Sequence, residues 1–459
     1  MADRTSARQI AVACQGGGSH AAFCAGALKA MLTAQEADGF RVTGLSGTSG
    51  GAVCATLAWY ALAQGRADPH RAAAAAAGLL ETFWTENTPA QWWERGFNEA
   101  GQIAARLPVE IRTSPYSYPL QEMLDLAATA HQHFGVPGPR PEFVSLATLL
   151  DKHAPGLARV RFDDVTLLLG AVDVKTGDFK VFNSREQDIS VQAVLASAAL
   201  PTLVRAVHIG GHDYWDGLFS QNPPLHNFVA DPDRADAKPD ELWVLQVNPQ
   251  AVDLPITNWE IEDRRNELAG NLSLNQEIGF IRRVNRWLVE GRLSCACAAG
   301  QVEYKPVIIY RIVMDGAALE PRVGTLDLAS KLDRRPDLIA ALIEQGETQA
   351  RLFLPVRRFV AEIWLEADAG IRRDRTAALF HGGKARDIGP LDTLLGAFRA
   401  FAIEIENLQF RCTNPADGQV SLDWILRGAD ADGTPLARSG TARFDVSAGR
   451  LENATIGVT

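Results

Sequence analysis

Residues Gly47-Thr48-Ser49-Gly50-Gly51 form a G-x-S-x-G pentapeptide between a strand-like segment and a small, apolar segment that suits a buried helix. A pentapeptide of this kind lets a strand turn sharply into a helix, and the turn exposes the serine hydroxyl. The glycines have a physical reason, because the strained turn needs a positive φ and close packing behind the serine leaves no space for a Cβ. Ser49 is therefore a candidate nucleophile. The alternative is that Ser49 is only the N-cap of a core helix.

A triple glycine, Gly16 to Gly18, follows a short buried strand expected over residues 9–14 and precedes a small-residue helix expected over 21–32. Bare backbone N–H groups at the start of a helix bind anions. One interpretation is a phosphate loop, but the sequence lacks Gly-Lys-Ser/Thr, and Ala21 stands where G-x-G-x-x-G needs its last glycine. The other interpretation is an oxyanion hole for a tetrahedral acyl intermediate. The serine turn about thirty residues downstream favours the oxyanion hole.

A seryl nucleophile needs a base, and Asp216 is the strongest candidate. It ends a hairpin expected over residues 207–219, has aromatic neighbours and is followed by Gly217. Apolar surroundings disfavour the charged form of a carboxylate and raise its pKa. The alternative is that Asp216-Gly217 is an ordinary turn, since this dipeptide commonly forms turns. Three histidines in segments that can return to the serine turn are further candidates: His208, His212 and His226.

The composition limits the classes of partner. The chain has 459 residues, is 47% hydrophobic and 22% charged, and is long enough for two or three globular domains. A formal net charge of −10 argues against nucleic acid as a main partner. Neither a signal peptide nor a run of 18 apolar residues is found, so we expect a cytoplasmic protein without a transmembrane helix.

The cysteines do not form a disulfide framework in a chain of this length. They are scattered at positions Cys14, Cys24, Cys54, Cys295, Cys297 and Cys412. Cys295-Ala296-Cys297 has no second Cys/His pair at ligand spacing, so we expect no metal site.

Strand and helix patterns alternate along the first three quarters of the chain. Strands are expected at 165–172, 179–182, 241–247 and 307–313, and helices at 71–85, 191–199, 264–291 and 336–354. The segment 264–291 is polar at first and then helical, and Ser273 and Gln276 form a candidate capping box ahead of its apolar positions, which begin at Ile278. A helical block at about 70–155 either covers the sheet or forms a lid or acyl channel beside the serine turn.

The order of expected elements changes near residue 355, from alternating strands and helices to helices followed by strands. We therefore predict two domains, 1–354 and 355–459. The second has expected helices at 356–367 and 391–402, followed by alternating segments at 403–411, 420–427 and 437–446. Asp432-Gly433 and Ala448-Gly449 supply turns between strands. Helices followed by an antiparallel meander form a separate α+β unit.

The order of Gly16 to Gly18, the serine turn and Asp216-Gly217 resembles that of the patatin-like phospholipases. The resemblance covers about residues 8–350 and includes the small-residue segment Ala196 to Pro201. It implies an α/β fold, specifically a three-layer α/β/α sandwich, and a lipid acyl hydrolase with a Ser-Asp dyad that needs no metal or cofactor. Ser49 would be the nucleophile and Asp216 its base. The implied oxyanion hole consists of backbone N–H groups at Gly16, Gly17, Gly18 and Gly50.

Four positions depart from the family pattern. Gln15, His20 and Ala21 replace the first residue, the basic residue and the last glycine of the glycine loop, and Leu218 follows Asp216-Gly217 where the family has Gly or Ala. The basic residue is thought to orient the loop, so His20 puts the loop geometry in question rather than the dyad.

Residues 355–459 are similar to SnoaL-like and ketosteroid-isomerase-like α+β cones, through His381, Gly389-Pro390 and the segment Phe444 to Leu451. His381 either lines an apolar cavity or is an ordinary polar loop residue. The resemblance implies a ligand-binding or dimerising module, and hence a homodimer.

Three functions compete. The first is a serine acyl hydrolase acting on a lipid or acyl ester, with peripheral contact to a membrane surface. The second is an α/β-hydrolase with a Ser-Asp-His triad, tested at His212 or His226. The third is an inactive lipid-binding or dimeric scaffold, which the departures at Gln15 and His20 keep open.

Overall fold

A computed structural model describes residues 7–106, 126, 129–130, 132–135, 138–201, 204–230, 234–293, 303–366, 368–380 and 389–458. Within these residues, no helix combines the length and the apolar character needed to cross a bilayer.

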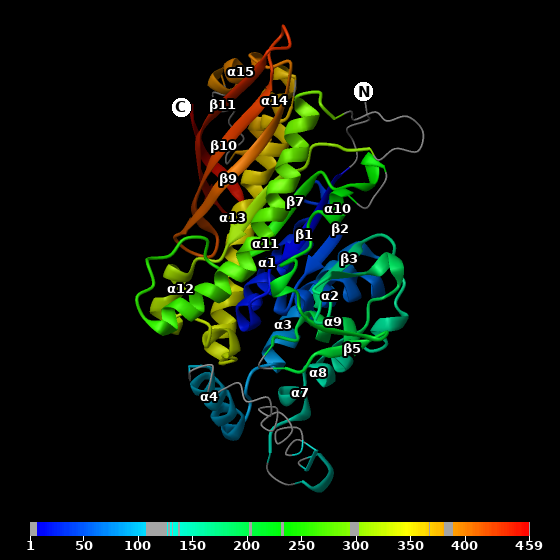
Figure 1. The fold of residues 1–459 in the computed structure, drawn as a ribbon. Helices are drawn as coiled ribbons and strands as arrows, with labels where there is room; N and C mark the ends of the chain where they lie inside the picture. The colour runs from blue at the N-terminus through cyan, green and yellow to red at the C-terminus, as the bar shows by residue number, and fades with distance from the viewer. Residues whose placement is uncertain are drawn as a thin grey trace.

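A mixed eight-stranded sheet forms the centre of the molecule (Figure 1). Its five parallel strands lie in the order β3-β2-β1-β7-β8. Their bounds are β1 Arg8–Cys14, β2 Phe40–Gly47, β3 Thr166–Asp173, β7 Glu241–Gln246 and β8 Ile308–Val313. Antiparallel strands continue the sheet beyond β3: β4 Phe179–Asn183, β5 Val207–Ile209 and β6 His212–Asp216. The expected strands are confirmed, and so is the hairpin expected over residues 207–219, which β5 and β6 form.

Helices flank both faces of this sheet, as expected for an α/β fold. On β1, Ile10, Val12 and Cys14 pack into one apolar cluster, whereas Ala11 and Ala13 pack into another. The first cluster includes helices α1 Ala22–Ala34, α2 Gly50–Gln64, α3 Pro69–Glu86 and α13 Pro336–Phe359. The second includes α10 Asn227–Ala230 and α11 Asn258–Val289. The parallel strands are thus buried on both sides, which explains their nearly continuous apolar sequences.

The helical block from about 70 to 155 contains α3, α4 Trp92–Arg106, α7 Pro141–Val144 and α8 Leu146–His153. In Figure 1, α4, α7 and α8 lie at the end of the molecule opposite the C-terminal sheet. Residues 107–125 lie outside the described residues. The choice between a covering layer and a lid therefore stays a prediction.

The predicted capping box at Ser273 is wrong. Helix α11 begins fifteen residues earlier, at Asn258, with a capping box formed by Thr257 and Glu260. Ser273 lies inside the helix, where its hydroxyl oxygen accepts a hydrogen bond from the Asn222 N–H at 3.2 Å. The first turns of α11 are mostly solvent-exposed and polar, so they lack the apolar periodicity from which a helix start is recognised.

A second, antiparallel sheet ends the chain in the order β12-β11-β10-β9. Its strands are β9 Ala400–Cys412, β10 Asp417–Ala429, β11 Pro435–Ser447 and β12 Arg450–Val458. The three alternating segments and both glycine turns are confirmed. The fourth strand was not predicted, because Arg450 to Val458 mixes polar and apolar residues. The helix expected over 391–402 is wrong at its end: α15 covers Gly389–Gly396, and strand β9 starts at Ala400.

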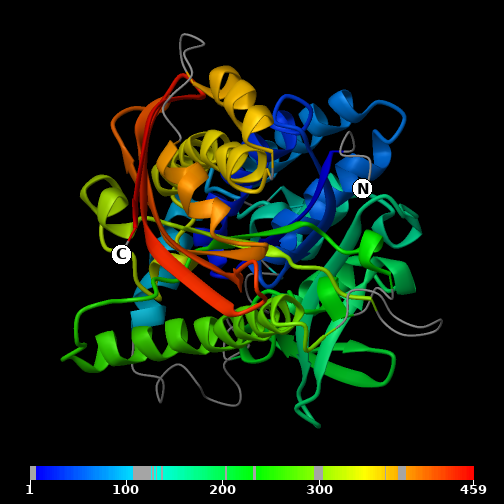
Figure 2. The same ribbon diagram turned by 90° about the horizontal axis from the view of Figure 1, so that it is seen from above.

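The C-terminal sheet curves around α13 and α14 Ala369–Leu379, as the view from above shows (Figure 2). Helix α13 runs without interruption through position 355 and continues into a π-helical turn, Val360–Trp364. Phe359 contacts Phe444 and Trp364 contacts Trp424, with ring centroids 5.3 and 5.4 Å apart. The cone-like character of this part and the domain boundary at 355 stay predictions, and His381 lies outside the described residues.

Candidate active site

Ser49 lies in the sharp turn between β2 and α2. Its backbone has φ 56° and ψ −130°, which is a strained conformation for a residue other than glycine. The turn is held from outside, because the Ser49 N–H donates to the Ser197 carbonyl oxygen at 3.0 Å. Ser49 occupies the N-cap position of α2, but its side chain makes no capping hydrogen bond. Helix capping therefore does not explain this serine.

Ser197, the last residue of α9 Val191–Ser197, braces this turn. Its hydroxyl donates to the Gly170 carbonyl oxygen of β3 at 2.7 Å, and the Ser49 N–H also approaches its Oγ at 3.2 Å. The sequence placed residue 197 in a segment of small residues but indicated no role for it. Its contact with Ser49 joins positions 148 residues apart, which no local pattern reveals.

Asp216 ends β6, where it pairs with Ala171 of β3. Its side chain is 1% exposed. The Leu218 N–H donates to Asp216 Oδ1 at 2.8 Å, and the side chain of Ser49 lies close enough to the carboxyl group to affect its pKa. Asp216 thus caps a short turn and lies near the candidate nucleophile, so the two interpretations of Asp216-Gly217 are compatible.

Burial raises the pKa of Asp216 from 3.8 to about 7, although the neighbouring Ser49 side chain and the hydrogen bond from the Leu218 N–H act in the opposite direction. Desolvation disfavours the charged carboxylate more than these two polar neighbours favour it. A carboxylate with a pKa near neutrality is a stronger base than an exposed aspartate and can still be ionised at physiological pH. Asp216 is therefore a buried carboxyl group whose raised pKa suits a general base.

The glycine loop lies next to the serine turn at the carboxyl edge of the sheet. The space where a Cβ of Gly50 would sit is 2.5 Å from the Gly18 carbonyl oxygen, so the two segments touch through their backbones. Gly17, Gly18, Ser49 and Gly50 are all half-buried and reach solvent together. Within the described residues, no hydrogen bond occupies the N–H groups of Gly17, Gly18 and Gly50. These three donors are available to an oxyanion.

Gly16 differs from the other glycines of the loop. Its N–H donates to Asn222 Oδ1 at 2.7 Å, so that donor is already used. Asn222 is fully buried, and its Nδ2 has no hydrogen-bond partner among the described residues. The sequence did not indicate Asn222, which lies 206 residues from Gly16. Its side chain fixes the start of the glycine loop.

Gln15, a departure from the family pattern, ties the glycine loop to two other elements. Its Oε1 accepts from the N–H groups of Val247 and Asn248, at 3.0 and 2.9 Å. Its Nε2 donates to Asn271 Oδ1 of α11 at 2.9 Å. A glycine at this position could make none of these side-chain bonds. The substitution is therefore compatible with a rigid loop.

His20, the second departure, is buried and uncharged. Burial, together with the nearby Lys331 ammonium, lowers the pKa of His20 to about 3. The Ser330 hydroxyl already donates to the Asp327 carbonyl oxygen at 2.7 Å, so His20 Nε2, at 2.9 Å from Ser330 Oγ, must be the donor. His20 therefore anchors the loop as a neutral donor and carries no charge at physiological pH.

Lys331 brings a positive charge to this region from a distant part of the chain. Its Nζ donates to Asn248 Oδ1 at 2.9 Å and to Asn266 Oδ1 at 2.7 Å. Burial lowers the pKa of this ammonium group, and the nearby carboxylates of Asp263, Glu267 and Asp327 oppose the shift. Its main chain packs directly against Gly18. No pattern in the sequence indicated this residue.

The three candidate histidines all have carboxylate partners of their own. Nδ1 of His208 lies 2.8 Å from Asp213, Nδ1 of His212 lies 2.6 Å from Asp173, and Nδ1 of His226 lies 2.7 Å from Glu277. None of them is hydrogen-bonded to Ser49 or Asp216 in the described structure. The geometry therefore does not assemble a Ser-Asp-His triad from these residues.

In the described part of the chain, no group of three or more His, Cys, Asp or Glu residues is arranged to hold a metal ion. Cys14, Cys24, Cys54 and Cys412 are free thiols. Cys295 and Cys297 lie outside the described residues.

We expect Gly18→Ala to destabilise the protein by about 2 kcal/mol or more and to impair the site. Gly18 has φ +56°, and a Cβ there would lie 2.1 Å from the Lys331 carbonyl oxygen, a backbone atom that cannot rotate away. Denaturant unfolding measures the loss of stability, and labelling of Ser49 by a fluorophosphonate measures the integrity of the loop.

Gly39→Ala is the matched control for this substitution. Gly39 has nearly the same φ, +64°, but nothing lies within 4 Å of its Cβ position. Gly39→Ala should lower the free energy of unfolding by only about 1 kcal/mol, the cost of placing a Cβ in a left-handed backbone conformation. The fluorophosphonate should still label Ser49 fully in this variant. Equal effects of the two substitutions would contradict the close packing of Gly18 against Lys331.

The comparisons with known proteins found similarity to one protein family. No curated protein sequence matches this chain significantly. Among solved structures, VipD from Legionella pneumophila is 14% identical with a TM-score of 0.34, and the match covers 76% of this chain and 67% of VipD. Full-length ExoU from the type III secretion system of Pseudomonas aeruginosa, in complex with full-length SpcU, is 13% identical with a TM-score of 0.24, and the match covers 85% of this chain and 77% of that chain. Residues 12–229, which contain the glycine loop, Ser49 and Asp216, match the model of the patatin-like phospholipase family.

Proposed function

We propose that this protein is a serine acyl hydrolase that cleaves acyl esters of lipids through a Ser49-Asp216 dyad. The observation that carries the proposal is the buried carboxyl group of Asp216, whose pKa is raised to about 7 and which the Ser49 side chain lies close enough to influence. The family match over residues 12–229 supports a lipid acyl hydrolase in general terms.

In the proposed reaction, Asp216 takes the proton from the Ser49 hydroxyl as Oγ attacks the ester carbonyl carbon. The negative oxygen of the tetrahedral intermediate accepts hydrogen bonds from the N–H groups of Gly17, Gly18 and Gly50, which have no hydrogen-bond partner in the described structure. Collapse of the intermediate expels the alcohol, which receives the proton from Asp216. A water molecule then attacks the acyl-enzyme with Asp216 again as base.

Gly16 has a supporting role in this proposal, because its N–H already donates to Asn222 Oδ1. The departures from the family pattern at Gln15 and His20 kept an inactive scaffold open as an alternative. Both side chains form hydrogen bonds that anchor the glycine loop, Gln15 to the Val247 N–H and His20 to the Ser330 hydroxyl. The proximity of Ser49 to Asp216 and the unoccupied donors therefore favour an enzyme over a scaffold. Contact with a lipid surface, dimerisation through residues 355–459 and a cytoplasmic location remain parts of the proposal.

A fluorophosphonate probe tests the proposal directly. We expect stoichiometric labelling of the purified protein, with the adduct on the peptide that contains Ser49. Asp216→Asn should slow the labelling strongly, because the hydroxyl then loses its base. A folded protein that takes up no probe, or one labelled at another serine, would favour the scaffold instead.

A further inference from the structure

The outer face of α11 is apolar, although the helix lies on the surface. A surface helix of a globular protein normally presents polar side chains to the solvent. Figure 2 shows α11 along one side of the molecule, and its inner face packs into one of the two apolar clusters of the sheet. Its outer face nevertheless exposes five large apolar side chains, each 38% to 62% exposed: Ile261, Leu268, Leu272, Phe280 and Trp287.

The spacing of these residues gathers them on one side of the helix. Ile261, Leu268 and Leu272 follow one another at intervals of seven and four residues, which return a side chain to the same face. Phe280 and Trp287 lie on the flank of this row. The loop that leads into α11 adds Leu254 and Ile256, which are 86% and 81% exposed. An apolar surface of this extent marks a contact with a partner.

The exposed charges of the same face are basic. Between residues 264 and 289 the acidic residues are Glu267 and Glu277, and both are buried. Arg264 pairs with Glu267 at 2.9 Å, and Arg282 pairs with Glu406 at 2.8 Å. The other arginines of this stretch are exposed and form no ion pair with any residue that the structure describes: Arg265, Arg283 and Arg286.

This basic face belongs to a chain whose formal net charge is −10. A negatively charged surface repels such a chain as a whole and attracts it only through a local positive region. The three unpaired arginines therefore decide both the charge of the partner and the side of the molecule that approaches it.

The inner face of α11 contacts the glycine loop. Asn271 Oδ1 accepts a hydrogen bond from Gln15 Nε2 at 2.9 Å. The Ser273 hydroxyl oxygen accepts from the N–H of Asn222, the residue that holds the start of the loop. An α-helix with its side chains is about 10 Å across. A partner on the outer face of α11 would therefore lie about one helix diameter from the candidate active site.

We infer that the outer face of α11 binds the surface of a lipid bilayer that contains anionic lipids. Apolar side chains with arginines between them suit the boundary between headgroups and acyl chains, and tryptophan is enriched at that depth. Each arginine can donate charge-assisted hydrogen bonds to a lipid phosphate. The inference rests on the proposed function in naming a lipid as the partner, because an acyl hydrolase of lipids has to reach a substrate held in a membrane.

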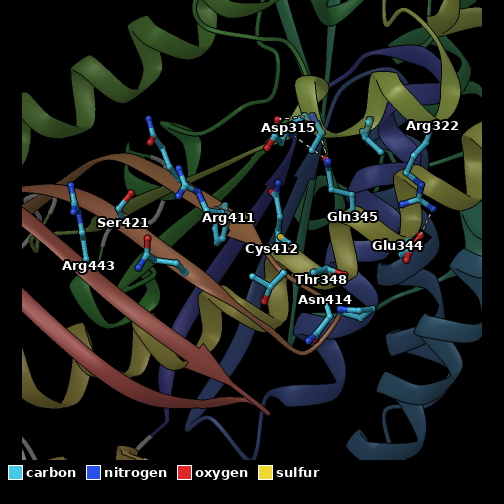
Figure 3. Close-up of a pocket in the computed structure, with 18 residues that line it drawn as sticks. Asp315, Arg322, Glu344, Gln345, Thr348, Arg411, Cys412, Asn414, Ser421 and Arg443 are labelled. Carbon is cyan, nitrogen blue, oxygen red and sulfur yellow. Dashed lines mark hydrogen bonds and ion pairs between the residues drawn. The ribbon is translucent and has the colours of Figure 1, made fainter.

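The cavity of about 720 Å³ between the C-terminal sheet and helices α12 Gly316–Val323 and α13 is separate from this surface (Figure 3). None of its lining residues belongs to α11. The lining is mostly polar and charged, and Arg322 there already binds Glu344 at 2.7 Å. This cavity therefore does not compete with α11 for a lipid surface.

Vesicle flotation of the full chain tests the inference. The assay uses the Ser49→Ala background, so that hydrolysis does not alter the lipids. We expect binding to vesicles of phosphatidylcholine mixed with phosphatidylglycerol. Binding to phosphatidylcholine alone should be weaker by about tenfold or more, because each arginine near an anionic surface contributes about fivefold.

Arg283→Gln measures the contribution of charge. It should weaken binding to the anionic vesicles by about fivefold and leave binding to phosphatidylcholine unchanged. Arg71→Gln is the matched control, since Arg71 is exposed on α3, a helix of the apolar cluster on the opposite face of the sheet. It makes the same change in net charge and should bind as the background protein does. Both positions are exposed, so the melting temperatures should not change.

Leu272→Gln measures the contribution of apolar contact. It should weaken binding to both kinds of vesicle by about fivefold or more, because less apolar surface leaves the water. Ile371→Gln is the matched control: Ile371 is 43% exposed on α14, outside the α11 face, so its removal should leave binding unchanged.

The inference is overturned if the protein binds neither kind of vesicle, or if Arg283→Gln and Leu272→Gln bind as well as their controls. It is also overturned if analytical ultracentrifugation shows a dimer that Leu272→Gln dissociates, because a second copy would then cover α11. Fluorophosphonate labelling separates this result from the proposed function. A protein that is labelled at Ser49 but binds no vesicle keeps the proposed function and loses this inference, whereas vesicle binding through α11 without labelling does the reverse.

Discussion

Ser49→Ala is expected to lower kcat/KM for a p-nitrophenyl ester by about 10⁴-fold or more, because in the proposed reaction the acyl-enzyme forms on Ser49 Oγ. The strained backbone of residue 49, with φ 56°, accepts alanine no worse than serine, and its N–H still donates to the Ser197 carbonyl oxygen. The variant should therefore unfold at nearly the wild-type denaturant concentration. Initial rates and a denaturation curve measured on the same preparation check both parts.

Ser46→Ala is the control for this substitution. Ser46 lies in β2 three residues before the nucleophile, is fully buried, and its Oγ has no hydrogen-bond partner in the described structure. Removal of this hydroxyl should change the rate by less than about threefold and should not destabilise the protein. If Ser49→Ala retained turnover while Ser46→Ala lost it, the proposed nucleophile would be wrong.

Asp216→Asn is expected to lower kcat/KM by about 10³-fold or more while making the protein more stable at pH 8. The amide cannot take the Ser49 proton, so the base is lost. It keeps an oxygen that can accept from the Leu218 N–H, which Asp216 Oδ1 now does at 2.8 Å. In the wild type, kcat/KM should rise with pH and level off above about 7, where Asp216 is ionised.

The stability effect follows from the pKa of Asp216, which is about 7 in the folded protein against 3.8 for an exposed aspartate. Between these values the folded state holds a proton that the unfolded state has released, so the free energy of unfolding falls as pH rises. Protonated Asp216 contributes fully to the free energy of unfolding below pH 3.8, and this contribution is lost above about pH 7. The difference between the two limits is up to about 4 kcal/mol. Asp216→Asn removes this pH dependence and should be stabilised at pH 8 by up to that amount.

Asp173→Asn, on the neighbouring strand β3, is expected to change the stability at pH 8 in the opposite direction to Asp216→Asn. Its hydrogen bond with His212 lowers the pKa of Asp173, so its stabilising contribution is present above its unfolded pKa and is lost as pH falls. Asp173→Asn should therefore destabilise the protein at pH 8 and leave the ester rate nearly unchanged. Destabilisation by Asp216→Asn at pH 8 would contradict a buried carboxylate that prefers its proton.

The sequence indicated the parts of the site whose chemistry is local. A strand, a glycine-bounded serine and a helix of small residues are enough to predict a strained turn at Ser49, because backbone conformation there is decided by a few neighbouring residues. The same holds for the triple glycine and for Asp216 at the end of a hairpin. These short segments also carry the order of motifs on which the family resemblance depends.

Sequence patterns predicted helices and strands wrongly where solvent exposure or tertiary packing, rather than a regular apolar face, decides where an element begins or ends. Helix α11 begins at Asn258 on an exposed polar surface, and the predicted start at Ser273 was wrong because only the later turns have a regular apolar face. Strand β12 was missed because a partly exposed last strand of a sheet needs little apolar alternation. The continuity of α13 through residue 355 is a packing effect, since both sides of this position enter one apolar cluster.

By itself, then, the amino-acid sequence determined the candidate nucleophile, the candidate base and the glycine loop, since each depends on residues that are adjacent in the chain. Only the tertiary structure decided what holds them: Ser197 on the Ser49 N–H, Asn222 on Gly16 and the Lys331 backbone against Gly18. The partners lie roughly 150 to 310 residues apart in sequence, and hydrogen bonds carry no periodicity that a single sequence displays. The physical reason is that a buried polar group is satisfied by whichever chain segment the fold brings to it, and that choice belongs to the packing of the sheet and its helices.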